Sequence, residues 1–341
     1  MSNQPPIEVP QGAIRLNTDS QKLEFFAQDR WYEMATENAS IGNRGFRVSG
    51  TGAGATLIES FNITTLGNSH DTGFDLSTSR GAIGCSASRT RAIICGGNAP
   101  GITGSNNIQY FEMTSLSNTI DFGDLTYNAA EAGAHSNNVR LVVTGAASHA
   151  SNVINFLTVA STGSAQDFGD QANKLSSTTA CGSPTRGLFA GGAIPSVVNI
   201  IEFVTIASTG NSVDFGDLTV ARYSAGSGSN NTRGLFIMGN AGSPTNQVNT
   251  IDFVTISSTG NAQDFGDSNM NDTGGPTQGA GVAASPNRIV FFGGYITGGT
   301  DRTTEMEYVN PTTRGNSTRF GDLETAQNSD GNALSSSHGG L

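Results

Sequence analysis

A motif that recurs six times constrains the fold of this chain more than any other feature. Each copy has an arginine, followed by glycine in three of the six copies, then an apolar pair and a closing glycine, as in the stretch 186–192, Arg-Gly-Leu-Phe-Ala-Gly-Gly. Successive copies begin 47, 48, 47, 47 and 55 residues apart, at Arg44, Arg91, Val139, Arg186, Arg233 and Arg288. A period of this length is typical of stacked supersecondary units that cannot bury their apolar faces alone.

Three further segments complete each repeat. The phrase Asp-Phe-Gly-Asp recurs at 121–124, 167–170, 214–217 and 264–267, with weaker forms at 73–75 and 319–322. An apolar segment, such as 201–206, comes before this phrase and is joined to it by a Ser-Thr-Gly turn. A segment of small residues, such as 224–229, comes before each arginine. Four short strands in about 47 residues predict one antiparallel blade.

The order of side-chain sizes predicts how the blades are arranged. The small residues suit an innermost strand, where six strands converge on one axis, and Phe and Ile fill the second and third strands. In the third strand Phe203 points to one face and Val204 to the other, as a blade between two neighbours requires. The sequence therefore predicts an all-β, six-bladed β-propeller over residues 44–341, because a β-helix uses much shorter periods. We expect residues 332–338 to return as the inner strand of the first blade, in competition with 37–42.

The first 43 residues do not follow the repeat. Residues 1–10 are expected to be a flexible N-terminus, and residues 11–43 to form a short three-stranded β-meander. In it Ile14, Leu16, Leu23 and Phe25 alternate with polar neighbours, which predicts one apolar face. So short a segment cannot bury such a face well by itself. We therefore expect a docking surface that includes Ile14, Leu16, Leu23, Phe25 and Trp31.

Two stretches resemble known families. The phrases Gly-Ala-Ile-Arg at 12–15 and Lys-Leu-Glu-Phe at 22–25, with an Asn-Thr turn at 17–18 and an aromatic-rich end, resemble a motif common in bacteriophage tail fibres and other virion structural proteins. The di-glycine that ends the second strand and the aromatic residue in the third resemble the kelch class of propeller repeats, including kelch-like repeats found in proteins of marine and cyanobacterial phages. Together the two resemblances cover nearly the whole chain.

The resemblances imply a structural component of a virus particle, assembled in the host cytoplasm and present in multiple copies. The N-terminal segment is expected to dock to other virion proteins. The propeller of a tail fibre or adhesin is expected to contact a host-surface glycan or neighbouring virion proteins. A purely architectural capsid fibre or tail-hub decoration and a polysaccharide depolymerase are the alternatives.

Composition argues against several other classes. The net charge is −11, and the chain has two lysines and no basic run, so nucleic-acid binding has little electrostatic basis. No apolar stretch approaches the roughly 18–20 residues that cross a bilayer, and no export signal precedes the repeats, so we expect neither membrane insertion nor export by that route. The three cysteines, Cys85, Cys95 and Cys181, lack metal or redox spacing and are expected to be free thiols.

No catalytic residue, metal site or cofactor is expected. Asp-Phe-Gly is also a kinase triplet, but here it recurs without the other kinase motifs, so its Phe is expected to pack between blades, its Gly to permit a bend and its aspartates to face solvent or cap turns. Glu59, Glu202 and Glu307 lie at equivalent repeat positions, which indicates a structural role. Loops that depart from the repeat, at 268–286 and 295–304, are where recognition usually occurs. Tyr295 and Arg302 are therefore the predicted host contacts.

Overall fold

The chain folds into strands and turns. A computed structural model describes residues 9–17, 22–27, 30–33, 43–48, 56–145, 151–193, 195–242, 246–270, 277–296, 303–325 and 333–341. These residues contain no helix, and so none that could cross a membrane. The chain divides into two compact units, Met1–Ser40 and Ile41–Leu341.

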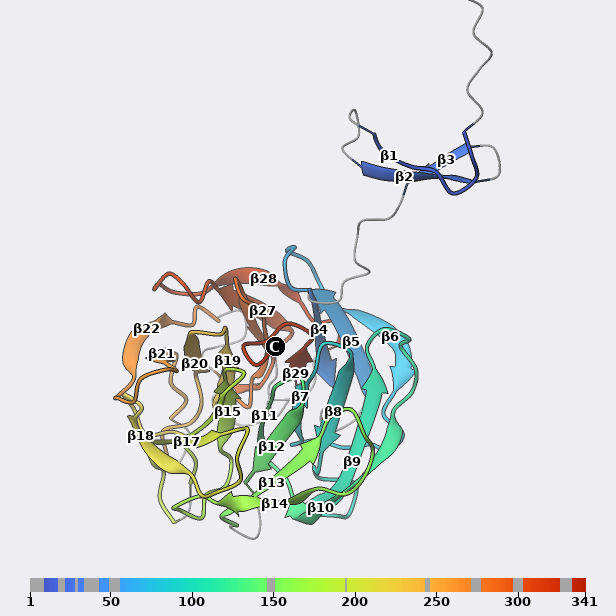
Figure 1. Cartoon of the computed structure of the whole chain (residues 1–341). Coiled ribbons are helices and arrows are strands. Elements are labelled where there is room, and N and C mark those ends of the chain that lie inside the picture. The colour runs from blue at the N-terminus through green and yellow to red at the C-terminus, as the bar shows by residue number, and fades with distance from the viewer. Residues whose placement is uncertain are drawn as a thin grey trace, which may run out of the picture. The chain divides into compact units, whose positions relative to one another are not determined.

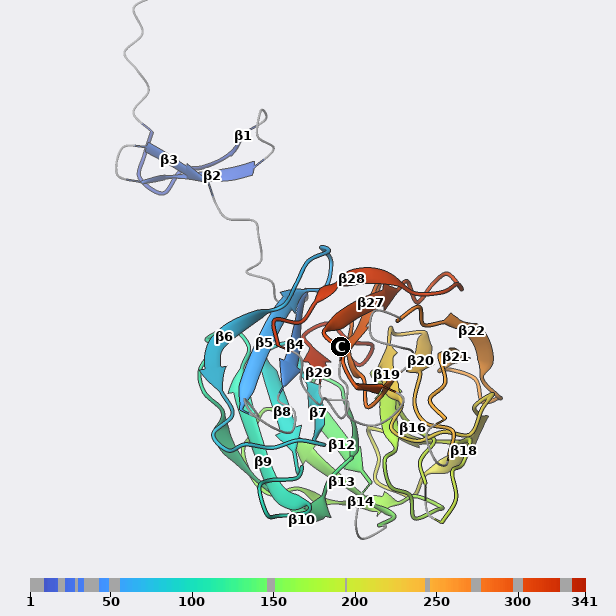
Figure 2. The ribbon, with the colours of Figure 1, turned by 180° about the vertical axis from the view of Figure 1, so that it is seen from behind.

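The larger unit is a six-bladed β-propeller, as predicted. Six four-stranded antiparallel sheets surround one axis, with their inner strands at the centre and their outer strands at the rim (Figure 1, Figure 2). Each inner strand contacts the inner strands of two neighbouring blades, so the ring is closed. From the first blade to the sixth, the inner strands are β29 (Ala333–Ser335), β7 (Gly84–Ala87), β11 (Gly133–Ser136), β15 (Thr179–Gly182), β19 (Gly226–Ser229) and β24 (Gly281–Ala284).

The second and third strands carry most of the apolar side chains. The second strands, each beginning at or next to the repeated arginine, are β4 (Arg44–Val48), β8 (Arg91–Cys95), β12 (Arg140–Thr144), β16 (Arg186–Ala190), β20 (Arg233–Ile237) and β25 (Ile289–Phe292). The third strands are β5 (Leu57–Asn62), β9 (Ser105–Glu112), β13 (Val153–Thr158), β17 (Ile200–Thr205), β21 (Thr250–Thr255) and β27 (Glu305–Val309).

The fourth strands form the outer edge of the propeller and contain the Asp-Phe-Gly-Asp phrases or, in β6 and β28, their weaker forms. They are β6 (His70–Asp75), β10 (Ile120–Ala129), β14 (Gln166–Asp170), β18 (Val213–Asp217), β22 (Gln263–Asp267) and β28 (Thr318–Asp322). An additional pair, β23 (Thr277–Gln278) with β26 (Tyr295–Ile296), was not predicted and lies where the sixth repeat is longest.

The core lies between the blades rather than within one. In one cluster, Leu235 and Phe265 of the fifth blade pack with Ile289 and Phe291 of the sixth. Near the axis the blades approach so closely that a side chain at Gly228 would stand 2.8 Å from Val282. This crowding is the physical reason for the small residues of the inner strands.

The last strand closes the ring, as the sequence predicts. In β29, Leu334 pairs with Phe46 and Ser335 with Gly45, so β29 is the inner strand of the first blade. Leu334 is 3% exposed and joins Phe46 and Phe111 in one cluster. The competing segment, 37–42, lies outside the described residues.

The smaller unit is a three-stranded antiparallel sheet of β1 (Ile14–Asn17), β2 (Lys22–Ala27) and β3 (Arg30–Glu33), in that order. On one face Arg15 pairs with Glu24 at 2.8 Å, and its guanidinium lies 4.1 Å from the ring centroid of Trp31. Phe26 meets the same ring edge-on. Polar and aromatic groups therefore cover each other on this face.

Candidate functional site

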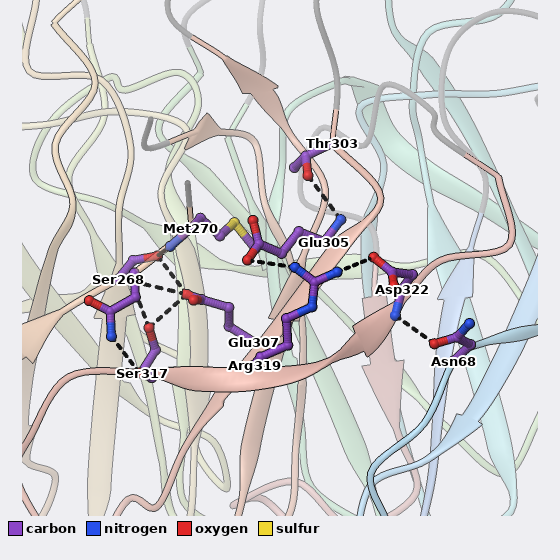
Figure 3. A network of polar contacts seen from close by, with 10 residues as sticks. Asn68, Ser268, Met270, Thr303, Glu305, Glu307, Ser317, Arg319 and Asp322 are labelled. Atoms are coloured by element: carbon purple, nitrogen blue, oxygen red, sulfur yellow. Dashed lines mark hydrogen bonds and ion pairs between the residues drawn. The ribbon is translucent and has the colours of Figure 1, made fainter. Parts of the chain in front are cut away.

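One buried polar position recurs in all six blades. It lies in the third strand, opposite the third residue after the repeated arginine. The residues in this position are 0–3% exposed: Glu59, Gln109, Asn155, Glu202, Asp252 and Glu307. Glu307 shows what they do, because it accepts hydrogen bonds from Ser317 of its own blade at 2.6 Å and from Ser268 of the fifth blade at 2.9 Å (Figure 3).

These carboxylates fasten one blade to the next. Burial raises the pKa of Glu307, and the hydroxyls of Ser317 and Ser268 oppose that shift by stabilising the charged form. Glu59 likewise accepts from Ser69 of its own blade at 2.6 Å and from the hydroxyl of Thr325, which follows the last strand of the sixth blade, at 2.5 Å. A polysaccharide chain cannot reach carboxylates that are buried to this degree. The geometry thus agrees with the structural role predicted for Glu59, Glu202 and Glu307.

The repeated arginines also link neighbouring blades. In five blades the guanidinium lies 4.4–4.9 Å from the centroid of the aromatic ring in the third strand. Arg186, for example, stacks on Phe203 and donates to the carbonyl of Ile256 in the next blade at 2.9 Å. The arginine side chain therefore joins the second strand, the third strand and the neighbouring blade.

The Asp-Phe-Gly-Asp phrase links neighbouring blades at the outer edge of the propeller. Phe168 is 2% exposed, Asp167 faces solvent, and Gly169 adopts a φ of 146°, a conformation that favours glycine. A side chain at Gly169 would overlap the backbone of Gly210, which lies in the Ser-Thr-Gly turn of the next blade. This close approach lets the amide of Gly210 donate to the carbonyl of Phe168 at 2.7 Å. The roles predicted for the Phe, Gly and first Asp are confirmed in this blade.

The structure separates the five predicted docking residues. Ile14 and Leu16 are 63% and 60% exposed, and the backbone register places Phe25 and Leu23 opposite them. Residues opposite each other on antiparallel strands share a face. Trp31 instead pairs with Phe26 and contacts Arg15, on the other face. The exposed apolar surface therefore excludes Trp31.

The structure describes one of the two predicted host contacts. Tyr295 lies in β26, where it is half-buried and pairs with Gln278. Gln278 precedes Gly279, which lines a cavity on the propeller axis. Arg302 lies outside the described residues.

A well occupies the propeller axis at the end where the inner strands begin, which we call the mouth end. Its cavity volume is about 80 Å³, and its lining includes Glu131, Ser177, Thr178 and Ser224 from the segments that lead into β11, β15 and β19. One residue from each inner strand forms the floor: Cys85, Ala134, Ala180, Ser227, Val282 and Ala333. The same six residues also line a smaller cavity, of about 40 Å³, on the other side of the floor.

The rim of the well has a repeated backbone conformation. Residues two places before the inner strands have positive φ: Ala82 (53°), Glu131 (52°), Ser177 (56°), Ser224 (49°) and Gly279 (72°). Non-glycine residues rarely adopt this conformation, and it is found where the surrounding structure requires it. Here the amide of Ser224 donates to the carbonyl of Ser177 at 3.0 Å, and that of Gly279 donates to Ser224 at 2.7 Å. Backbone hydrogen bonds between neighbouring blades therefore join the residues at the edge of the well.

The last residues of the chain cover the opposite, latch end of the axis, and the C mark lies at the centre of the blades in Figure 1. His338 Nε2 lies 2.6 Å from the carbonyl of Ala87, and the amide of Gly340 donates to His338 Nδ1 at 3.1 Å. His338 is therefore neutral, with its proton on Nε2. The ring of His135 stands 5.6 Å away, centroid to centroid.

These two histidines are expected to make the fold sensitive to acid. Burial lowers the pKa of His135 to about 3, and nearby His338 adds to that effect; burial lowers the pKa of His338 to about 4. The unfolded chain takes up these protons near pH 6.5, whereas the folded chain resists them, so the free energy of unfolding falls as pH drops below about 6.5. We expect a loss on the order of 2–3 kcal/mol for each histidine by about pH 4.5.

Urea unfolding at several pH values, compared between the parent chain and His135→Gln, measures this loss. The variant should show a flatter pH dependence. Equal slopes for the parent and His135→Gln would contradict the assignment.

The cysteines offer no reactive thiol. All three are free, as predicted. Burial raises the pKa of Cys85 and of Cys181 to about 12, and that of Cys95 further, so at neutral pH all three are protonated. Among the described residues, no group of three or more His, Cys, Asp or Glu side chains is placed to hold a metal ion.

Sequence reasoning missed Glu131. A signal was present, because Glu131 is the charged member of a set, with Ala82, Ser177, Ser224 and Gly279, that lies two residues before successive inner strands. The set can be recognised only after the inner strands are placed in register.

No family model matches the chain, and a search of curated proteins finds no match.

Proposed function

We propose that this chain is a structural and adhesive component of a virus particle, most directly a bacteriophage tail fibre or adhesin. In this proposal the N-terminal sheet docks to other virion proteins, and the propeller is a rigid body that displays its mouth end. Many copies on one particle would convert weak single contacts into tight attachment.

The exposed pair Ile14 and Leu16 is the observation that carries the proposal. These two large apolar side chains are 63% and 60% exposed on one strand of a three-stranded sheet. A sheet of this size has little core of its own, and burial of an apolar side chain stabilises by about 1.5–3 kcal/mol. A protein surface that covers this pair would therefore stabilise the sheet and hold the propeller in place. The resemblance of residues 12–25 to tail-fibre proteins supports a virion as the partner.

The fate of the repeated residues supports a binding role rather than a catalytic one. The buried carboxylates, the arginines and the Asp-Phe-Gly-Asp phrases are occupied in joining blades. A ring fastened at the axis, in the third strands and at the rim suits a rigid display platform.

The double variant Ile14→Asp/Leu16→Asp is expected to abolish incorporation into particles. Charged side chains on the apolar pair cannot be buried against a partner without a large desolvation cost. Purified particles would be assayed for the tagged chain by quantitative mass spectrometry, with at least a tenfold loss expected.

Val139→Asp/Val213→Asp is the matched control, because these valines are 60% and 57% exposed on the propeller. The control chain should be incorporated at the parent level, and both variants should keep the parent melting temperature of the propeller. Absence of the parent chain from particles, or normal incorporation of the Ile14/Leu16 variant, would refute the proposed docking.

A further inference from the structure

The well at the mouth end has a one-sided charge. Glu131 supplies a carboxylate, and the described residues that line the well include no Arg, Lys or His. The hydroxyl of Ser177 donates to one carboxylate oxygen of Glu131. An anionic ligand would find no positive side chain here, whereas a cationic group would find the carboxylate.

The walls of the well also carry hydroxyl groups. The hydroxyl of Ser177 donates to Glu131, and that of Ser227 donates to the carbonyl of Ala180 at 2.8 Å. Ser224, which is half-buried, adds a further hydroxyl to the lining. Pockets of this kind bind ligands through a few placed polar groups, so the ligand should carry hydrogen-bonding groups of its own.

The size of the well and the groups that line it narrow the range of possible ligands. A buried water molecule needs about 10–15 Å³ of cavity, so the well, at about 80 Å³, has room for a group that replaces roughly five to eight waters. This is the scale of one sugar ring. A calcium ion is a poor fit because it takes 6–8 oxygen ligands and favours several carboxylates, whereas the lining supplies one.

We propose that the well binds an amino sugar, with the ammonium group against Glu131 and the ring hydroxyls against Ser224. The proposal deepens the adhesive function and rests on it for its biological meaning. The ammonium forms a charge-assisted hydrogen bond with the carboxylate, and the apolar walls of Ile83, Ala132 and Val282 face the C–H groups of the ring.

The test measures binding of D-glucosamine to the purified full chain by ligand-observed NMR and calorimetry. D-glucose and N-acetyl-D-glucosamine, which share the ring but lack the ammonium, are the matched ligands. We expect a Kd on the order of 1 mM for glucosamine, because the ligand is small, and at least tenfold weaker binding of the two neutral sugars.

Glu131→Gln should weaken glucosamine binding at least tenfold, because it removes the charge at nearly constant shape. Asp264→Asn, which removes the same charge from an exposed site at the rim, should leave binding unchanged.

Equal binding of glucose and glucosamine, or parent-like binding by Glu131→Gln, would overturn the proposal. So would the absence of any signal at about 20 mM glucosamine, some twentyfold above the expected Kd. These outcomes are separate from the particle assay: a chain that enters particles but ignores glucosamine keeps its virion role and loses this ligand. A chain that binds glucosamine but is absent from particles does the reverse.

Discussion

A chain that ends at residue 332 is expected to lose its folded propeller. The deletion removes β29, which supplies the inner strand of the first blade and closes the ring between β7 and β24. It exposes Phe46, which packs against Leu334, and it breaks the hydrogen bond from Ser335 to the carbonyl of Ala284 in the sixth blade. The lost apolar contact alone is worth about 2–4 kcal/mol, and the strand pairing adds to it, against a typical total stability of about 5–15 kcal/mol.

Circular dichroism and limited proteolysis would show the loss as a melting temperature lowered by more than about 10 °C, or as a chain that is protease-sensitive at room temperature. A synthetic peptide of residues 326–341, added in excess, should restore part of the stability by binding in place of the missing strand. Leu334→Ala is the milder companion and should cost about 2–4 kcal/mol. A truncated chain with the melting temperature of the parent would show that the propeller is stable without β29.

Much of the propeller follows from the sequence because its physical constraints repeat. Crowding at the axis demands small residues in every inner strand, so segments such as 226–229 and 281–284 are recognisable by composition. The close approach to the next blade favours glycine at position 169, and a φ of 154° favours glycine at position 210, so both recur with the period. Six instances of one constraint reveal it, whereas a single instance would be read as a loop. The role of the C-terminal strand was predictable because the repeat requires an inner strand in every blade and the first blade lacked an obvious one.

The candidate site was not predictable because it is made of exceptions to the repeat. Glu131 stands where Ala82 and Ser224 stand in other blades, and this equivalence becomes visible only after the inner strands are aligned with one another. His135 and His338 are far apart in sequence and meet only because the ring closes. The face on which Trp31 lies could not be predicted, because the hydrophobic pattern does not fix the register between β2 and β3, which pairs Trp31 with Phe26.

Replacing Asp252 with alanine is expected to destabilise the propeller by about 3–5 kcal/mol. Arg222 and Asp252 are both fully buried and pair at 2.9 Å. Arg222 also donates to the carbonyl of Phe236, but its Nε and Nη1 have no hydrogen-bond partner within the described structure. Burial lowers the pKa of Arg222, yet a guanidinium stays charged at neutral pH, so the variant leaves a buried and largely uncompensated cation. Urea unfolding of the parent and the variant at pH 7 measures the difference.

Glu202→Ala is the matched comparison, because Glu202 occupies the same repeat position one blade earlier. Its partners are Ser212 and Asn173, so its removal orphans hydrogen-bond donors but no buried cation, and the expected cost is about 1–3 kcal/mol. The double variant Arg222→Met/Asp252→Ala should regain much of the stability that Asp252→Ala loses, since removing both charges removes the desolvation penalty. If Asp252→Ala costs no more than Glu202→Ala, and the double variant regains nothing, then Arg222 is stabilised without its carboxylate. In that case hydrogen bonds alone, and not charge pairing, fasten the fourth blade to the fifth.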